Sequence, residues 1–131
     1  MTNLDKLKGL TTAKTFSKGT VIINEGDTTP YNMYIVLQGT VAVYKKFRQF
    51  GETSLAVLGP GNFFGEMSLF LQRPRSATVV SKEETVTLEI NQSNFHKIIA
   101  EFPDVAYTLM QTLCSRLPDE EKEKAGLLPK E

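Results

Sequence analysis

The stretch of sequence that decides the fold is residues 63–80, which read FFGEMSLFLQRPRSATVV. Two phenylalanines lead into Gly65, Glu66 follows directly, and Arg75 stands nine positions after Glu66, where it opens a β-branched run. The segment Glu66–Leu71 is long enough for one or two helical turns and holds few polar residues. The pattern therefore predicts a short helix that begins at a glycine.

This arrangement of residues suits an anion that carries a sugar. A helix that begins at a glycine presents backbone N–H groups and the positive end of its dipole. Arg75 adds a permanently charged, planar group that can bond two phosphate oxygens at once. Glu66 only accepts hydrogen bonds when ionised, so it suits a sugar hydroxyl rather than the phosphate. A binding site for an anion, an acceptor for a sugar hydroxyl and an apolar wall together indicate a nucleotide ligand.

The same residues resemble the phosphate-binding cassette of the cyclic nucleotide-binding domain family. That family includes regulatory subunits of cAMP-dependent kinase, cyclic-nucleotide-gated channels and bacterial cAMP receptor transcription factors. The glycine, the glutamate, the arginine and the small residue two places after the arginine stand at the family's spacing. The resemblance implies a ligand site formed by Phe64, Gly65, Glu66, Met67, Ser68, Arg75, Ser76 and Ala77.

Single residues of this set also have structural explanations. Arg75 could be a surface arginine on a strand, and Glu66 could be a first-turn acid stabilised by the helix dipole. Ser68 could face solvent, or it could present its backbone N–H to a phosphate as the resemblance implies. Because Glu66 and Arg75 occur together with Gly65 and Ala77, the sequence favours the site over these separate explanations.

The base, rather than the phosphate or ribose, must distinguish cAMP from cGMP. Ser76 carries a hydroxyl that could bond the phosphate or a purine edge, which leaves cGMP open. Ala56 and Leu58 are candidates for an apolar wall around the base, although core packing explains them equally well. An adenine needs only apolar surroundings, and Ser76 matches the serine of bacterial cAMP receptors. The resemblance therefore favours cAMP over cGMP.

Composition argues against several other classes of protein. The 131 residues carry 15 Lys plus Arg and 15 Asp plus Glu, for a formal net charge of zero, and show no basic stripe. We therefore expect no nucleic-acid partner for this domain. No stretch reaches the length of a membrane span and the N-terminus lacks a signal-peptide core, so we expect a cytoplasmic domain without a membrane segment. The single Cys114 falls in an apolar helical pattern and is interpreted as a small core residue.

Enzyme chemistry finds little support in the sequence. A jelly-roll metalloenzyme needs several strand histidines, whereas His96 is the only histidine and lies in a helical pattern, where we interpret it as a half-buried structural residue. There is no recognisable nucleophile motif with a histidine partner and no Walker-type loop. We therefore expect no enzyme activity, no metal and no cofactor besides the nucleotide ligand.

The sequence around the cassette predicts a mainly β fold in one domain. Short alternating strands separated by glycines occupy roughly residues 12–90, which indicates a barrel or jelly roll. The expected strands include 21–24, 33–38, 41–44, 54–58 and 85–90. Gly26 and Gly39 are interpreted as turn residues of the barrel. The resemblance implies an eight-stranded jelly roll, a double-stranded β-helix, with the short phosphate-binding helix and flanking N- and C-terminal helices.

The helical spacing returns after the barrel. Asn91 is a capping candidate for one helix, Pro103 begins a second, and Pro118 ends it, so the C-terminal helices occupy about 91–117. A short N-terminal helix is expected over Met1–Leu10, and the charged tail 118–131 could be helical or disordered. The resemblance implies that the C-terminal helices cover the nucleotide and relay its binding to an effector domain or protein.

Two points stay open at this stage. A ligand-free jelly-roll scaffold or protein-interaction domain is the alternative function, although the intact Glu66 and Arg75 argue against a lost ligand. The second C-terminal helix could pack Leu109 and Leu113 on the barrel, or it could present them to a partner in a homodimer. The sequence does not identify the regulated effector.

Overall fold

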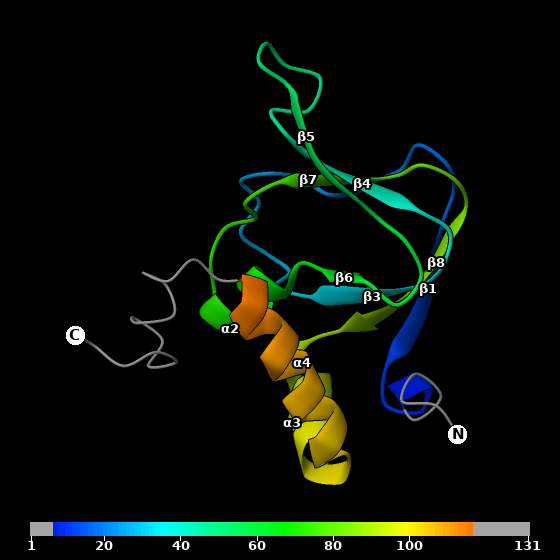
Figure 1. The fold of residues 1–131 in the computed structure, drawn as a ribbon, viewed down its shortest axis with the longest axis vertical. Coiled ribbons are helices and arrows are strands. Elements are labelled where there is room, and N and C mark those ends of the chain that lie inside the picture. The colour runs from blue at the N-terminus through cyan, green and yellow to red at the C-terminus, as the bar shows by residue number, and fades with distance from the viewer. Residues whose placement is uncertain (1–6, 117–131) are drawn as a thin grey trace, which may run out of the picture.

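Two four-stranded antiparallel sheets face each other in the computed structural model, and helices lie at one end of them (Figure 1). The structure describes residues 7–116, apart from the side chains at positions 112, 113 and 116. Within these limits Leu7 and Lys8 are helical, while most of the predicted N-terminal helix and all of the predicted tail at 118–131 lie outside the described residues.

The order of the strands is that of a jelly roll. One sheet has the order β1-β8-β3-β6, with β1 at Thr12–Phe16, β8 at Thr85–Ile90, β3 at Met33–Gln38 and β6 at Phe63–Phe64. The other has the order β2-β7-β4-β5, with β2 at Val21–Ile23, β7 at Thr78–Ser81, β4 at Val41–Lys45 and β5 at Thr53–Leu58. The helices are α2 at Glu66–Leu71, α3 at Gln92–Glu101 and α4 at Pro103–Arg116. The predicted mainly β, eight-stranded fold is confirmed.

Strand β3 joins two hydrophobic clusters because successive side chains of a strand point to opposite faces. Its Met33 and Ile35 pack in a cluster with residues of β8, α3 and α4. Its Tyr34 and Val36 pack between the two sheets with residues of β2, β4, β6 and β7. The barrel therefore has one core inside it and a second core beneath the C-terminal helices.

Strand β8 alternates polar and apolar residues, and two of its polar residues are buried. Thr85 and Thr87 are fully buried, and their hydroxyls donate hydrogen bonds to the backbone carbonyls of Thr40 at 3.2 Å and Lys14 at 3.3 Å. These bonds replace the water that the hydroxyls lose on folding. The alternation of apolar and polar residues correctly predicts a strand here, but Thr85 and Thr87 on its polar side are buried as well, while Glu89 is half-buried.

The turn after β3 depends on a glycine. Gly39 has φ +91°, and a Cβ atom at this position would lie 2.5 Å from the carbonyl oxygen of Glu84 and 2.7 Å from the Cα of Thr85. Gly26 also has φ +91°, without such close neighbours. The predicted turn role of both glycines is confirmed, and at Gly39 the absence of a side chain also lets two turns approach each other.

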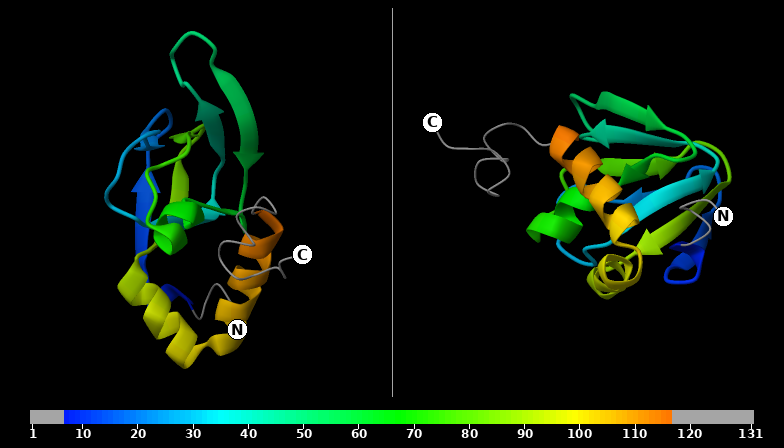
Figure 2. Two further views of the ribbon diagram at one scale, coloured as in Figure 1. Left: turned by 90° about the vertical axis from the view of Figure 1, so that its left-hand side faces the viewer. Right: turned by 60° about the horizontal axis from the view of Figure 1, so that its bottom comes forward.

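The C-terminal helices begin where the sequence predicts. Asn91 caps α3, because its side chain accepts from the backbone N–H of Asn94 at 2.8 Å and the Asn94 side chain accepts from the Asn91 N–H at 3.1 Å. Leu109 of α4 is buried in the cluster below the barrel, so it packs on the domain itself. The side chain of Leu113 lies outside the described residues. Figure 2 shows α3 and α4 at the end of the molecule opposite the loop between β4 and β5.

Two predictions about side chains on these helices need correction. His96 is exposed rather than half-buried, because Phe95 and Ile98 form the buried face of α3 and the residue after Phe95 points away from that face. Cys114 is half-buried rather than part of the core. Both residues are therefore less buried than the sequence pattern predicts.

Candidate functional site

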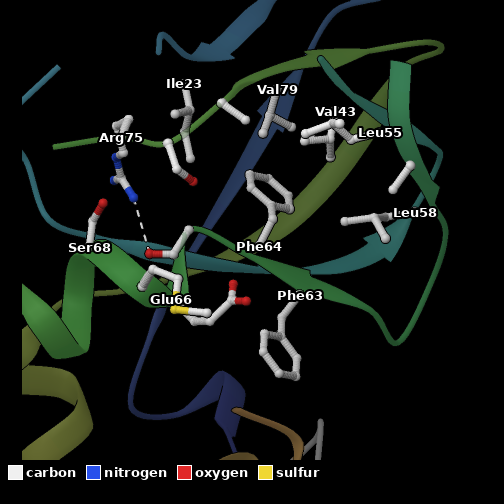
Figure 3. Close-up of a pocket in the computed structure, with 15 residues that line it drawn as sticks. Ile23, Val43, Leu55, Leu58, Phe63, Phe64, Glu66, Ser68, Arg75 and Val79 are labelled. Atoms are coloured by element: carbon white, nitrogen blue, oxygen red, sulfur yellow. Dashed lines mark hydrogen bonds between the residues drawn. The ribbon is translucent and has the colours of Figure 1, made fainter. Parts of the chain in front are cut away.

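A cavity of about 520 Å³ opens where β6 and α2 meet the segment before β7 (Figure 3). All the predicted site residues line it, namely Phe64, Gly65, Glu66, Met67, Ser68, Arg75, Ser76 and Ala77. The other lining residues are Ile23, Val43, Leu55, Ala56, Leu58, Phe63 and Val79. The structure thus brings two separate segments of the cassette together around one cavity.

The backbone conformation of Gly65 brings α2 and Arg75 close together. Gly65 is the N-cap of α2 and has φ +81°. A Cβ atom at this position would lie 2.8 Å from the carbonyl oxygen of Asn32 and 2.9 Å from Nη1 of Arg75. A glycine is therefore required both for the left-handed conformation and for the close approach of the guanidinium.

The guanidinium of Arg75 is held by backbone carbonyls. Its Nη1 donates to the carbonyl oxygen of Gly65 at 3.1 Å, the bond drawn in Figure 3, and its Nη2 donates to that of Pro30 at 2.8 Å. The whole residue is only 6% exposed. A guanidinium has five N–H donors, so these two bonds fix its position and leave it donors for a ligand.

The backbone of Arg75 is held as well. Its N–H donates to the carbonyl oxygen of Asp27 at 2.7 Å, and its own carbonyl oxygen accepts from the N–H of Gly26 at 2.8 Å. The turn at residues 25–27, which sequence reasoning assigned only to the barrel, therefore also positions Arg75. No local signal could show this, because the two segments are far apart in the sequence. The arginine lies in the loop before β7 rather than on a strand, so the surface-strand alternative is wrong.

The charge of Arg75 is affected by its surroundings. Burial lowers the pKa of the guanidinium, while nearby Tyr34, Asp27 and Glu66 raise it. Because an arginine starts far above neutral pH, it stays charged. Burial, followed by the neighbouring Glu89, raises the pKa of Tyr34, whose ring stacks on Phe64 with centroids 5.1 Å apart. The site thus combines one buried cation with Phe64, a lining residue that is stacked on Tyr34 of the core.

The start of α2 supplies the polar side of the cavity. Glu66 and Ser68 are 7% and 2% exposed, which excludes the solvent-facing alternative for Ser68. The first backbone hydrogen bond of the helix runs from Leu69 N–H to the carbonyl oxygen of Gly65 at 3.4 Å. The N–H groups of Met67 and Ser68 precede this bond and lie in the first turn, where a helix favours negative charge.

The remaining wall of the cavity is apolar. Ala56 and Leu58, the two candidates for this wall, line it, and sequence reasoning missed Ile23, Val43, Leu55, Phe63 and Val79. Ile23, Val43 and Val79 alternate in strands in the same way as core residues, and Leu55 is 52% exposed on β5, so the sequence offered no signal that they line a cavity. Among the described residues that line the cavity, none belongs to α3 or α4, which pack their buried faces below the barrel.

Residues 7–116 also lack two kinds of feature. They contain no group of three or more His, Cys, Asp or Glu residues that could hold a metal ion. None of the described helices has the length and apolar character needed to cross a membrane.

Comparison with known proteins agrees with this geometry. The family described as "Cyclic nucleotide-binding domain" matches residues 13–102. A cyclic AMP receptor protein of Thermus thermophilus is 34% identical over 108 residues, which cover 82% of this chain and 50% of that protein. The chain therefore spans half the length of this relative.

Solved structures share the fold. The catabolite activator protein of Thermus thermophilus has a TM-score of 0.79 at 31% identity, over 95% of this chain and 58% of that one. A cAMP-bound PfPKA-R has a TM-score of 0.63 at 30% identity, over 70% of this chain and 32% of that one. Because the family match covers most of the chain and includes both halves of the cavity, the protein belongs to the cyclic nucleotide-binding domain family.

Proposed function

We propose that this domain binds a cyclic nucleotide, cAMP in preference to cGMP, and acts as a regulatory module rather than an enzyme. The observation that carries the proposal is the buried guanidinium of Arg75, fixed by two backbone carbonyls beside an apolar cavity of about 520 Å³. Ligand cavities typically have this size and combine apolar walls with a few oriented polar groups.

Each part of the nucleotide has a matching part of the cavity. The cyclic phosphate would accept hydrogen bonds from Arg75 and from the first-turn N–H groups of Met67 and Ser68. The carboxylate of Glu66 would accept from the ribose 2′-OH. The purine would pack against the apolar wall that includes Val43 and Leu58. No catalytic step is assigned to any of these residues.

The preference for cAMP rests on the wall around the base. The residues of this wall are aliphatic or aromatic, and Ser76, which carries the hydroxyl that could bond a purine edge, is exposed. The names of the Thermus thermophilus receptor and of the PfPKA-R structure both refer to cAMP. Calorimetric titration is expected to give a lower Kd for cAMP than for cGMP. A ligand-free scaffold would give no binding heat with either nucleotide.

The ribose contact predicts the effect of removing one hydroxyl. Wild-type protein should bind 2′-deoxy-cAMP about tenfold or more weakly than cAMP, because a hydrogen bond to a charged group contributes about 1.5–3 kcal/mol. Glu66→Gln should narrow this gap, since a neutral amide forms a weaker bond. Both ratios can be measured by isothermal titration. Equal affinities of the wild type for the two nucleotides would show that Glu66 stabilises the helix instead.

A physical link joins the cavity to the C-terminal helices. Phe70 of α2 contacts Phe95 of α3 edge to face, with ring centroids 4.7 Å apart. Phe63 lines the cavity and also belongs to the cluster that contains Leu109 of α4. A ligand that shifts α2 would therefore disturb the packing of both helices. Such a shift needs different ligand contacts in the two arrangements.

Hydrogen exchange tests binding and relay separately. Adding cAMP should protect the amides of residues 65–77 and those of the C-terminal helices from Phe102 onward, while β1 and β8 change little. Linear 5′-AMP, which lacks the cyclic phosphate, serves as the control ligand and should protect less. Protection confined to residues 65–77 would leave a binding protein without a relay. No protection at any concentration of cAMP would remove both parts of the proposal.

A further inference from the structure

We infer that the hairpin tip, residues 45–52, which comprises the last residue of β4 and the loop before β5, is a docking surface for an anionic phospholipid bilayer. This surface lies away from the nucleotide cavity, whose lining residues include none from positions 45–52. The inference does not depend on which nucleotide binds.

The hairpin tip projects from the domain. Strands β4 and β5 pair from Val41–Leu58 to Lys45–Thr53, and the loop beyond them rises above the rest of the barrel, opposite α3 and α4 (Figures 1 and 2). The loop is closed by hydrogen bonds from Gln49 N–H to the carbonyl oxygen of Lys46 at 2.9 Å and from Glu52 N–H to that of Gln49 at 3.1 Å. It is therefore an ordered projection that can meet a flat surface before any other part of the barrel.

A phenylalanine occupies this projection without any cover. Phe50 is 102% exposed, more than any other large apolar side chain among the described residues. Single exposed apolar residues are common in proteins. A phenyl ring wholly in water at a projecting loop, however, is placed to enter an apolar phase without any rearrangement of the domain.

Cations lie close to Phe50 in the sequence of the hairpin tip. Lys45, Lys46 and Arg48 are exposed within four positions of the loop, and Lys82 lies beside them with its Nζ 6.0 Å from the ring of Tyr44. The nearby carboxylates are Glu25 and Glu52. Glu25 accepts from Lys45 Nζ at 3.5 Å and from the Lys46 N–H at 2.9 Å, and Glu52 accepts from the Arg48 N–H at 2.8 Å. At the hairpin tip the three cations Lys45, Lys46 and Arg48 thus outnumber the two carboxylates bonded to it, whereas Lys82 is followed by the exposed Glu83 and Glu84.

The geometry favours a bilayer over single-stranded nucleic acid. Bases stack on open aromatic faces beside a basic groove. Here Tyr44 and Phe47 pack on each other at 4.9 Å, and Arg48 lies over the Phe47 ring at 4.9 Å, so these two rings are already engaged. Phe50 alone remains, and it projects outward rather than lining a groove. A ring inserted among lipid chains, with lysines and arginine at the level of anionic headgroups, fits this arrangement.

Vesicle sedimentation tests the inference with the full chain. Wild-type protein should sediment with vesicles of phosphatidylcholine and phosphatidylserine in equal parts, and not with phosphatidylcholine vesicles alone. Phe50→Ser should reduce the bound fraction about tenfold, because it removes the inserted apolar surface. The double substitution Lys46→Gln with Arg48→Gln should act similarly, and added salt should weaken wild-type binding.

Matched controls make the result decisive. Tyr107→Ser removes another exposed ring, 64% exposed on α4 at the opposite end, and should leave vesicle binding unchanged. Phe50→Ser should keep the thermal midpoint and the cAMP affinity of the wild type. The inference is overturned if wild-type protein fails to bind phosphatidylserine vesicles, if Phe50→Ser binds them equally, or if a single-stranded oligonucleotide binds in a Phe50-dependent way and vesicles do not.

Discussion

Replacing Arg75 with alanine is expected to weaken cAMP binding by about a hundredfold or more. The guanidinium is the buried cation of the cavity, and losing a charge-assisted, two-oxygen contact costs a few kcal/mol. Arg75→Lys should lie between alanine and wild type, because it keeps the charge and loses the planar fork. Isothermal titration gives the three affinities directly.

A neighbouring arginine provides the control for this experiment. Arg73 is exposed and does not line the cavity, so Arg73→Ala should bind cAMP like the wild type. Arg75→Ala also removes the donor to the carbonyls of Gly65 and Pro30, so its stability should be measured by urea unfolding before affinities are compared. A folded Arg75→Ala variant with wild-type affinity would show that the phosphate binds elsewhere.

Gly39→Ala is expected to cost about 2–4 kcal/mol of the free energy of unfolding. A positive φ is unfavourable for alanine by roughly 1 kcal/mol, and a methyl group forced into a packed site adds about 1–3 kcal/mol. The new Cβ would lie 2.5 Å from the carbonyl oxygen of Glu84 and 2.7 Å from the Cα of Thr85. Both are backbone atoms and cannot rotate away. Urea unfolding followed by circular dichroism measures the loss.

Gly19→Ala separates the conformational cost of a positive φ from the steric cost of the added methyl group. Gly19 has a similar φ of +83°, and no atom lies within 4 Å of its Cβ position. Gly19→Ala should therefore show only the conformational cost of about 1 kcal/mol. The difference between the two variants measures the close approach of the turns at Gly39 and Glu84. Equal losses would mean that these turns move apart in solution at little cost.

The cassette was predictable because its residues are close in sequence. The short helix and the glycine before it follow from local spacing, the family resemblance supplies the remaining site residues, and the structure gathers every predicted residue around one cavity. The alternation in β3 and β8 likewise predicts strands. Sequence patterns predict a structure well where the residues that form it belong to one continuous segment.

Contacts between distant segments could not be predicted in the same way. The carbonyl of Pro30 and the turn at Gly26 and Asp27 hold Arg75 only after the jelly roll closes. The aliphatic wall residues, such as Val43 and Val79, read as core positions because lining a cavity and filling a core require the same side chains. The error at His96 has a simpler origin: Phe95 and Ile98 already mark the buried face of the helix, and the residue after Phe95 falls outside that face.

The position of α3 and α4 has a consequence for the speed of the proposed response. Since no described cavity-lining residue comes from these helices, a nucleotide can enter without first displacing them. With an association rate constant of about 10⁶ M⁻¹ s⁻¹, a complex with a Kd of about 1 µM would dissociate at about 1 s⁻¹. The fraction of domain with bound nucleotide would then adjust to a change in nucleotide concentration within seconds, and nucleotide bound earlier would dissociate on the same time scale.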